Sequence, residues 1–575
     1  MASLTALYVA LLSVGVFSSL VTAANGPCPF NPSECYCEDS EGMAGFQVAT
    51  CQSKNSVIPQ FIGSDGTYSI YDELSLTFSA YIIEPRSFVA FKEIEFLNMT
   101  QPIGPGLVYA RWSPQAFYGP LIKGFAISNV AGVIPPPEAL VEIAGNLENL
   151  HIIHCRQPIS LTASAFSSFN NLKVLLIKDT PISKVDDTAF GGLENSLVEL
   201  WLINTNLEMF PTKALAPLTK LYRIDLTNSN IQQWTANAFQ TFTDLTFLTL
   251  TGNNVAAASN VGAFDHMPQS VVTLFLDGSV PSLSQVPAKI LAGALQVTIL
   301  SLARNDISHI RNGDFPKGNQ LITLDLSVNP ITKIESGAMQ YLTELENLAL
   351  RVTLLHEFDL SLLSGMDHLY NLDLSESYLL TYLNITNVDL VPSTILNINL
   401  QNTSVEIIDP QFDKVIQRQP HFRSLDISDL RTIDCNPSIS WMAKYIFCMP
   451  VRIWTIETKC KTGDYLSDYL SKLVPDPCQL ATSTAPPPTS SSVPPSSSQA
   501  ITTPPPASSS VFTTSAPPAS SSADVTSSVA TAPASTTVAP TTTAKKGASS
   551  TGTSNIVLTI SMTMGAVLAV FIKSI

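Results

Sequence analysis

Apolar residues recur at one spacing across the middle of the chain, from Leu147 to Ile433. One phrase, Leu-x-x-Leu-x-Leu-x-x-Asn-x-Ile-x-x-Ile, aligns twelve times at steps of 24 to 27 residues. Its first positions fall at residues 147, 172, 197, 221, 245, 271, 297, 321, 345, 369, 395 and 422. A fixed period of this length predicts a solenoid in which each repeat forms one coil. Three looser coils precede these, led by Leu74 and Leu76, Ile94 and Phe96, and Phe125 and Ile127, so we expect roughly fifteen coils.

Each part of the phrase has a physical role. The Leu-x-Leu core places two apolar side chains on one face of a short strand, because successive side chains alternate between the faces. The asparagine that follows can turn inward, where its amide both donates and accepts hydrogen bonds at the bend. This asparagine occurs at Asn253, Asn305 and Asn329. A second bend carries an aromatic residue at Phe166, Phe190, Phe239, Phe264 and Phe315. One coil cannot bury these faces alone, so the coils must stack.

The chain is acidic overall. It has 46 acidic and 30 basic residues, a net charge of −16, and no basic run. This balance disfavours nucleic acid and anionic membrane surfaces as partners.

The N-terminal residues 1–23 are typical of a secretory signal peptide. An apolar stretch from Ala6 to Val16 leads to the small-residue pattern Val21-Thr22-Ala23, although no lysine or arginine precedes it. An N-terminal membrane anchor is the alternative, but serines interrupt an apolar run that is already short for spanning.

Nine cysteines agree with export to an oxidising compartment. Two groups of four bracket the repeats, and Cys155 stands alone between them. The groups are Cys28, Cys35, Cys37 and Cys51, and Cys435, Cys448, Cys460 and Cys478. A solenoid has two open ends, which disulfide-bonded caps would cover. The sequence alone permits three pairings within each group.

These motifs together resemble extracellular leucine-rich-repeat proteins with N- and C-terminal cysteine caps. The spacing Cys28-x6-Cys35-x-Cys37-x13-Cys51 is similar to the N-terminal cap of that family. The resemblance implies first-with-third and second-with-fourth pairing, which gives Cys28–Cys37 and Cys35–Cys51. The segment from Cys435 to Cys478 is similar to the C-terminal cap.

The C-terminal cap departs from the family at one position, because Pro437 stands where a second cysteine is usual. The resemblance implies Cys435–Cys460, and the two remaining cysteines, Cys448 and Cys478, would form the other bond. Cys155 takes the asparagine position of its coil, where we expect a buried structural thiol; an intermolecular disulfide is the alternative.

The resemblance extends to arthropod Toll-like ectodomains, to chaoptin- and connectin-type adhesion proteins, and to the non-catalytic leucine-rich subunit of a shrimp-type luciferin monooxygenase. It does not choose among them, because all share the repeat phrase. It implies an α/β solenoid, a leucine-rich-repeat horseshoe with a parallel concave sheet and disulfide caps, to which the composition of the following residues adds a disordered stalk.

The composition changes abruptly after Cys478. Residues 479–546 are almost entirely Ser, Thr, Pro and Ala, which cannot form a core and is typical of a mucin-like stalk. An unmodified disordered tail is the alternative.

Small residues, a polar spacer and the apolar stretch 556–572 then form a pattern typical of GPI attachment. Gly547 fits the attachment site best, and Ser549 and Ser550 are close rivals. A transmembrane helix is the alternative, and Lys573 departs from the GPI pattern.

The expected organisation has six parts. They are a signal peptide (1–23), an N-terminal cysteine cap (24–70), leucine-rich repeats (71–433), a C-terminal cysteine cap (434–478), a stalk (479–546) and a GPI-attachment signal (547–575). N-glycosylation sequons occur at Asn98, Asn384 and Asn402.

No catalytic motif occurs in the sequence, and no cofactor is expected. The one candidate metal cluster is His151-x-x-His154-Cys155. On the strand of their coil both histidines should point to solvent while Cys155 turns inward, so the three would not converge on one ion as zinc requires.

Strand residues between the buried leucines, at positions 3, 5, 7 and 8 of the phrase, should face the concave side. In the N-terminal and central coils these positions are apolar or aromatic with charged neighbours, as at an interface hot spot. The predicted ligand-binding residues are Ile153, Val174, Leu176, Trp201, Ile203, Arg223, Asp225, Phe247 and Phe275. Later coils carry a polar face there. Aromatic residues that merely stack across strands are the alternative.

The sequence therefore predicts a non-catalytic cell-surface module that binds an extracellular or cell-surface protein. It would reach the membrane through a lipid anchor, and homodimerisation stays open. The alternatives are a structural protein of matrix or cuticle, which would not need a membrane tail, and a non-catalytic subunit of a secreted enzyme, which rests on resemblance alone.

Overall fold

The computed structural model describes residues 137–478, apart from 420, 431–432 and 450–451, and shorter N-terminal stretches. These stretches are residues 26–27, 35–39, 47–53, 68–78, 82–83, 86, 88, 91–100, 111–112 and 115–129. The expected signal peptide, stalk and GPI signal lie outside the described residues. Within the described residues, no helix has the length and apolar character needed to cross a membrane.

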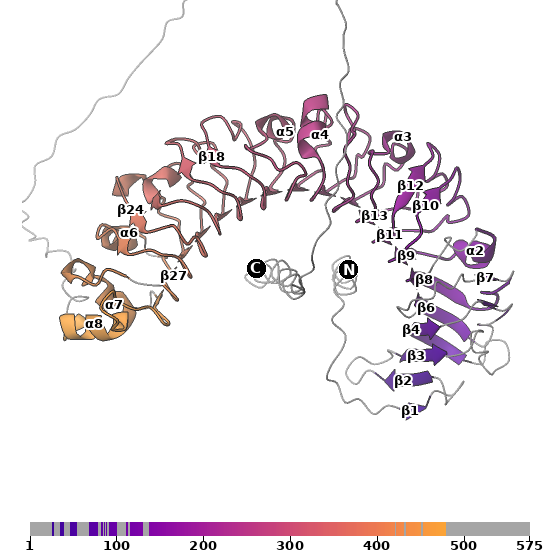
Figure 1. Ribbon diagram of the computed structural model, residues 1–575, viewed down its shortest axis with the longest axis horizontal. Helices are drawn as coiled ribbons and strands as arrows, with labels where there is room; N and C mark the ends of the chain where they lie inside the picture. The colour runs from indigo at the N-terminus through magenta and orange to yellow at the C-terminus, as the bar shows by residue number, and fades with distance from the viewer. Residues whose placement is uncertain are drawn as a thin grey trace, which may run out of the picture. The chain divides into compact units, whose positions relative to one another are not determined.

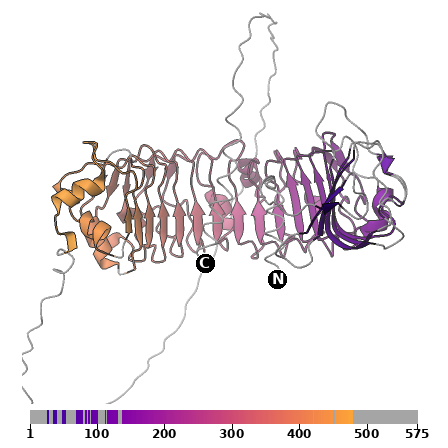
Figure 2. The ribbon, with the colours of Figure 1, turned by 90° about the horizontal axis from the view of Figure 1, so that it is seen from below.

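A 19-stranded sheet runs through the described residues. Strands from β3 onward pair in parallel, whereas β1 and β2 pair antiparallel. The repeat strands line the inner side of the arc, with short helices on the outer side (Figure 1), and stand side by side in Figure 2. The strands are β1 (Gly26–Pro27), β2 (Cys35–Asp39), β3 (Gln47–Ser53), β4 (Tyr68–Phe78), β6 (Phe91–Thr100), β8 (Leu121–Ser128), β9 (Asn149–Ile153), β11 (Val174–Lys178), β13 (Glu199–Ile203), β14 (Arg223–Asp225), β15 (Phe247–Thr249), β16 (Thr273–Phe275), β17 (Ile299–Ser301), β19 (Thr323–Asp325), β21 (Asn347–Ala349), β23 (Asn371–Asp373), β25 (Asn397–Asn399), β27 (Ser424–Asp426) and β28 (Arg452–Trp454).

The outer segments form small sheets and short helices. The outer strands are β5 (Ile82–Ile83), β7 (Arg111–Trp112), β10 (Ile159–Leu161), β12 (Ile182–Val185), β18 (His309–Ile310), β20 (Lys333–Ile334), β22 (Glu357–Asp359), β24 (Tyr382–Asn384) and β26 (Ile407–Ile408). The helices are α2 (Pro137–Ala144), α3 (Thr212–Leu215), α4 (Val255–Val261), α5 (Ala288–Gly293), η1 (Leu360–Leu363), η2 (Val388–Leu390), α6 (Phe412–Arg418), η3 (Pro437–Ile439), α7 (Met442–Phe447) and α8 (Leu466–Leu473).

The sheet register confirms fifteen coils, with β4 in the first and β27 in the last. It corrects the second coil, because Leu74 and Leu76 lie beside Leu97 and Met99 rather than beside Ile94 and Phe96. Leu97 and Met99 are fully buried. The Phe96 ring therefore lies on the concave face, not in the core.

The inward asparagines tie each coil to the one before it, as the sequence predicts. The Asn253 Oδ1 atom accepts a hydrogen bond from the Ile231 amide at 2.9 Å, and its Nδ2 atom donates to the Leu226 carbonyl at 2.7 Å. Both partners belong to the preceding coil. Asn305 and Asn329 make equivalent bonds. Every such bond satisfies a backbone group that would otherwise be buried without a partner.

Other coils use a smaller polar residue at this position. Thr205 Oγ1 donates to Ser229 Oγ at 2.9 Å, and both residues are fully buried. Cys155 is buried, as the sequence predicts, and its backbone amide donates to Thr180 Oγ1 at 3.0 Å.

The predicted phenylalanines are buried behind the sheet, and those of neighbouring coils pack ring against ring in pairs. Phe166 and Phe190 lie parallel with ring centroids 5.8 Å apart, and Phe239 and Phe264 lie 5.3 Å apart. All four are nearly inaccessible to solvent. Burial of such rings supplies much of the free energy that holds one coil on the next.

The residue at position 8 adopts a left-handed backbone in coil after coil. Positive φ occurs at Asn129, His154, Asp179, Asn204, Asn228, Gly252, Gly278, Arg304, Val328, Val352, Glu376, Asn402 and Asp429. Here the chain leaves its strand, and from Asn129 to Asn402 the amide of each donates to the carbonyl at position 7 of the next coil, as Val328 does to Arg351 at 2.8 Å. Asparagine, aspartate and glycine tolerate this conformation, whereas a β-branched residue is strained in it.

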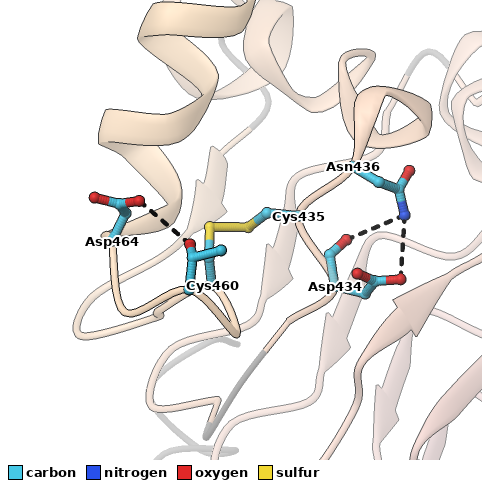
Figure 3. The surroundings of a disulfide bond; sticks show 6 residues. Asp434, Cys435, Asn436, Cys460 and Asp464 are labelled. Atoms are coloured by element: carbon cyan, nitrogen blue, oxygen red, sulfur yellow. Dashed lines mark hydrogen bonds between the residues drawn. A yellow bond between two sulfur atoms is a disulfide. The ribbon is translucent and has the colours of Figure 1, made fainter.

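The C-terminal cap closes the last coil. Two disulfides, Cys435–Cys460 and Cys448–Cys478, are the pairs expected from the sequence. Around the first bond, the Cys460 amide donates to the Asp464 carbonyl and Asn436 bonds to Asp434 (Figure 3).

The cap packs on α6, which belongs to the coil before the last. Lys444 Nζ lies 2.6 Å from Asp413 Oδ1, to which the Tyr445 hydroxyl also donates. The rings of Trp441 and Phe412 lie 5.8 Å apart. In this way the open apolar end of the solenoid is covered.

The N-terminal disulfides Cys28–Cys37 and Cys35–Cys51 stay predictions, because these side chains lie outside the described residues. The backbone register places Cys35 opposite Cys51 in the antiparallel pair β2–β3.

Replacing Val328 by asparagine should stabilise the protein. Val328 has φ of 58° and is 43% exposed, so little apolar burial is lost. We expect Val328→Asn to raise the free energy of unfolding by about 1 kcal/mol, the typical cost of a left-handed residue with a β-carbon. Chemical denaturation of the secreted ectodomain measures the change.

Val198→Asn is the matched control, because Val198 is 37% exposed and has no positive φ. This change should leave stability unaltered or lower it. Equal effects of the two substitutions would contradict the strain at Val328.

Candidate protein-binding face

The concave face is built from positions 3, 5 and 7 of every coil. Parallel register stacks equal positions of successive strands, so Glu199, Arg223 and Phe247 lie side by side across β13, β14 and β15. Trp201 lies beside Asp225, and Phe275 lies beside Thr249 and Ser301. The face is therefore a set of side-chain rows that cross the strands.

At the N-terminal end of the concave face, side chains pack against one another. The expectation that His151 points to solvent is wrong, because His151 is only 4% exposed. The Phe96 ring from β6 lies 5.3 Å from the imidazole of His151. Gly124 on the intervening strand permits this, because a β-carbon there would lie 2.2 Å from the Phe96 ring.

Burial lowers the pKa of His151 to about 4, so the imidazole is neutral at physiological pH. Among the described residues, its Nε2 atom has no hydrogen-bond partner. The His154 Nε2 atom instead lies 2.9 Å from Asp179 Oδ2, so the two histidine side chains do not approach a common point. No group of metal-binding side chains occurs within the described residues.

Three of the predicted ligand-binding residues are buried. Val174 and Leu176 are nearly inaccessible although they lie on the concave side. Asp225 is also buried, and its Oδ1 atom accepts hydrogen bonds from the amide and hydroxyl of Thr227 at 3.0 and 2.6 Å. Burial raises the pKa of the Asp225 carboxyl. These three side chains offer a ligand little surface.

The structure brings three others together. The Arg223 guanidinium lies 4.9 Å from the centre of the Trp201 ring and 4.5 Å from that of Phe247, so it is held between two aromatic faces. The indole Nε1 atom of Trp201 donates to Glu199 Oε2 at 3.0 Å. All of these side chains are partly exposed.

Tyr222 completes this group, although the sequence analysis missed it. Its ring meets that of Phe247 edge to face, with centroids 5.1 Å apart, and is exposed. Tyr222 occupies position 2, at the border of the concave face. A large aromatic residue at this position is the feature of the sequence that could have predicted its place in the site. We call Trp201, Tyr222, Arg223 and Phe247 the aromatic–arginine cluster.

Ile153, Ile203 and Phe275 are partly exposed on the concave side. Ile203 follows Trp201 by two residues on the same strand, and Phe275 lies two strands beyond Arg223. They flank the aromatic–arginine cluster rather than join it.

The later coils carry an amide row at position 3. Asn371 Nδ2 donates to Asn347 Oδ1 at 2.6 Å, and Asn397 Nδ2 donates to Asn371 Oδ1 at 2.7 Å. The Ser424 hydroxyl continues the row to Asn397 at 2.8 Å. The polar face expected here is therefore a connected network rather than a set of free amides.

The three sequons lie in different surroundings. Asn98 faces the concave side of β6, where Thr100 Oγ1 donates to its Oδ1 atom at 3.4 Å. Asn384 ends the outer strand β24. Asn402 is exposed and has the left-handed position-8 backbone. Glycosylation at each stays a prediction.

Family comparisons agree with this architecture. A leucine-rich-repeat family model matches residues 296–355, and a model of the BspA-type leucine-rich-repeat region matches residues 144–266. No curated protein matches significantly.

Many solved structures share the fold. A Toll chain from the Drosophila Toll–Spatzle complex aligns with TM-score 0.50 and 17% identity over 72% of this chain. The TLR13 chain of a complex with ssRNA13 aligns with TM-score 0.45 and 18% identity over 68% of this chain. The alignments span 62% of the Toll chain and 64% of the TLR13 chain. At this identity the likeness establishes the fold alone.

Proposed function

We propose that this chain, a leucine-rich-repeat protein by its coils, its caps and its family matches, is a non-catalytic cell-surface module that binds a protein ligand on its concave face. The observation that carries the proposal is the aromatic–arginine cluster, in which Arg223 lies between the Trp201 and Phe247 rings. Tryptophan, tyrosine and arginine are the residues that most often dominate protein interfaces.

The geometry of the cluster supports this role over simple packing. The guanidinium is preorganised by two rings, and the indole is held by Glu199, so a ligand would order few side chains on binding. Less conformational entropy is then lost, which favours affinity. The neighbouring strands hold the cluster in fixed register, unlike a site on a mobile loop.

The comparison adds support of a more general kind. The Toll chain that shares this fold was solved in a complex with Spatzle, and a concave parallel sheet is an extended binding surface in many solenoids. Neither observation identifies the ligand of this protein.

Export and anchoring complete the proposal. The two disulfides of the C-terminal cap favour an oxidising compartment. The predicted signal peptide and GPI signal would then place the repeats on the outer leaflet, beyond the predicted stalk.

Removing the aromatic anchors should weaken ligand binding. We expect Trp201→Ala and Phe247→Ala each to cost about 2 kcal/mol, roughly a thirtyfold loss of affinity, because each removes a ring that holds Arg223. The ligand is first identified by using residues 24–478 as bait against secreted and cell-surface proteins, and the affinity of each variant is then measured.

Tyr341→Ala is the control, because Tyr341 is an exposed aromatic residue in the segment between the outer strand β20 and the sheet strand β21. It should bind like the wild type. Wild-type affinity in the Trp201/Phe247 double variant would place the binding site elsewhere.

The GPI anchor has a separate test. Phosphatidylinositol-specific phospholipase C should release the ectodomain from expressing cells, because the lipid would be the only membrane attachment. Retention on the cells, together with a mature chain that still contains residues 556–575, would instead support a transmembrane helix.

A further inference from the structure

We propose that the concave face beyond the aromatic–arginine cluster binds a cationic segment of the ligand, whose lysine or arginine side chains meet a row of aspartates. The inference rests on the proposed protein-binding function and specifies the chemistry of the partner. The row consists of Asp325, Asp373 and Asp426, at position 5 of their coils, which we call the aspartate row.

The three aspartates end every second strand in this part of the sheet, β19, β23 and β27. Neutral residues stand on the strands between them, at Ala349 and Asn399. Strands lie ~4.8 Å apart, so the carboxylates are spaced at roughly 10 Å along the arc.

The fold needs only a hydrogen-bond acceptor at these positions. Each of Asp325, Asp373 and Asp426 accepts a hydrogen bond from the amide two residues later, at 2.8, 3.0 and 2.9 Å. Asn399 makes the same bond at 3.0 Å without a charge. An asparagine would therefore serve the turn equally well, and the negative charge is additional to what the turn requires.

Salt bridges balance the negative charge of these aspartates only in part. Burial raises the pKa of Asp373. Among the described residues, Asp325 and Asp426 make no salt bridge, and Arg351 is shared between Asp373 and Glu376. Some exposed carboxylates elsewhere are paired, as Asp187 is with Lys213 and Asp244 with Lys220.

A second observation points to a ligand at the same face. Thr273, at position 3 of β16, is 4% exposed, and its Oγ1 atom has no hydrogen-bond partner among the described residues. It lies between Phe247 of the aromatic–arginine cluster and Ile299. A buried hydroxyl without a partner is uncommon in a native structure, and this one lies beside the cluster, on the side toward the aspartate row.

The spacing favours a polypeptide over a metal ion. Carboxylates that share a calcium ion must both approach within about 2.6 Å of it, which a separation of roughly 10 Å prevents. An extended chain advances ~3.3 Å per residue, so a basic residue at every third position would meet successive carboxylates. An apolar residue at one end of that segment would reach the aromatic–arginine cluster.

The test uses the full-length protein, purified in detergent and immobilised, and two labelled peptides. One peptide has a tryptophan followed by five Lys-Gly-Ser repeats, and the other has glutamate in place of lysine. We expect the lysine peptide to bind at about 50 mM NaCl and to weaken as salt rises, and the glutamate peptide not to bind.

The triple variant Asp325→Asn, Asp373→Asn and Asp426→Asn should bind the lysine peptide about tenfold more weakly, because it loses three carboxylates but keeps the acceptors. The matched control is Asp187→Asn, Asp244→Asn and Asp389→Asn, which changes the net charge equally at exposed, salt-bridged sites. The control should bind like the wild type.

Equal weakening of both triple variants would overturn the inference, because net charge alone would then attract the peptide. Unchanged binding in the aspartate-row variant, or its displacement by millimolar calcium, would overturn it as well. None of these outcomes decides the proposed function, which is tested separately by measuring the affinity of the Trp201 and Phe247 variants for the natural ligand.

Discussion

The whole architecture depends on the buried polar residue that follows each strand. Where the chain bends, backbone amides and carbonyls would enter the core without partners, and each would cost about 1–3 kcal/mol. The side chains of Asn253, Asn305 and Asn329 each accept a hydrogen bond from a backbone amide and donate one to a backbone carbonyl of the preceding coil. The bond that completes one bend therefore also fixes the spacing to the next coil.

This constraint separates the inner and outer sides of the coil. The bend forces a left-handed residue at position 8, whose amide extends the ladder of hydrogen bonds beyond the strand. The inner side is then a continuous sheet with its residues in fixed rows, whereas the outer side varies among helices, short strands and turns. A surface of fixed rows can display chemistry at regular intervals, as the aspartate row does.

Sequence reasoning reached the parts of the fold that depend on the repeat itself. The coil number, the inward asparagines and the buried phenylalanines follow from a pattern that recurs in phase, whereas the two C-terminal disulfides follow from the family resemblance. It was wrong at β6, where Ile94-x-Phe96 and Leu97-x-Met99 both fit the Leu-x-Leu core, and only the pairing with Leu74 and Leu76 decides between them.

The candidate site was harder to predict because exposure on the concave face depends on neighbouring strands. His151 is buried because the Phe96 ring packs against it, in the space that Gly124 leaves on the strand between them. Phe96 lies 55 positions earlier in the chain, so local sequence does not reveal this contact. Val174 and Leu176 occupy outward positions but are buried. By contrast, Trp201, Arg223 and Phe247 were predicted together, since they are large residues in adjacent rows and their contact follows from the register alone.

The most direct test of the central claim, that the concave face binds the ligand, is to block that face with a glycan. Ile299→Asn creates an Asn-Leu-Ser sequon at a concave position that is 36% exposed, and Tyr341→Asn creates Asn-Leu-Thr outside the sheet at a position that is 38% exposed. Glycosidase-sensitive mobility shifts establish that both sites are occupied, and ligand binding to each glycosylated protein is then measured. The account predicts that the glycan at position 299 abolishes binding while the glycan at position 341 leaves it intact, and full binding with the glycan at position 299 would contradict it.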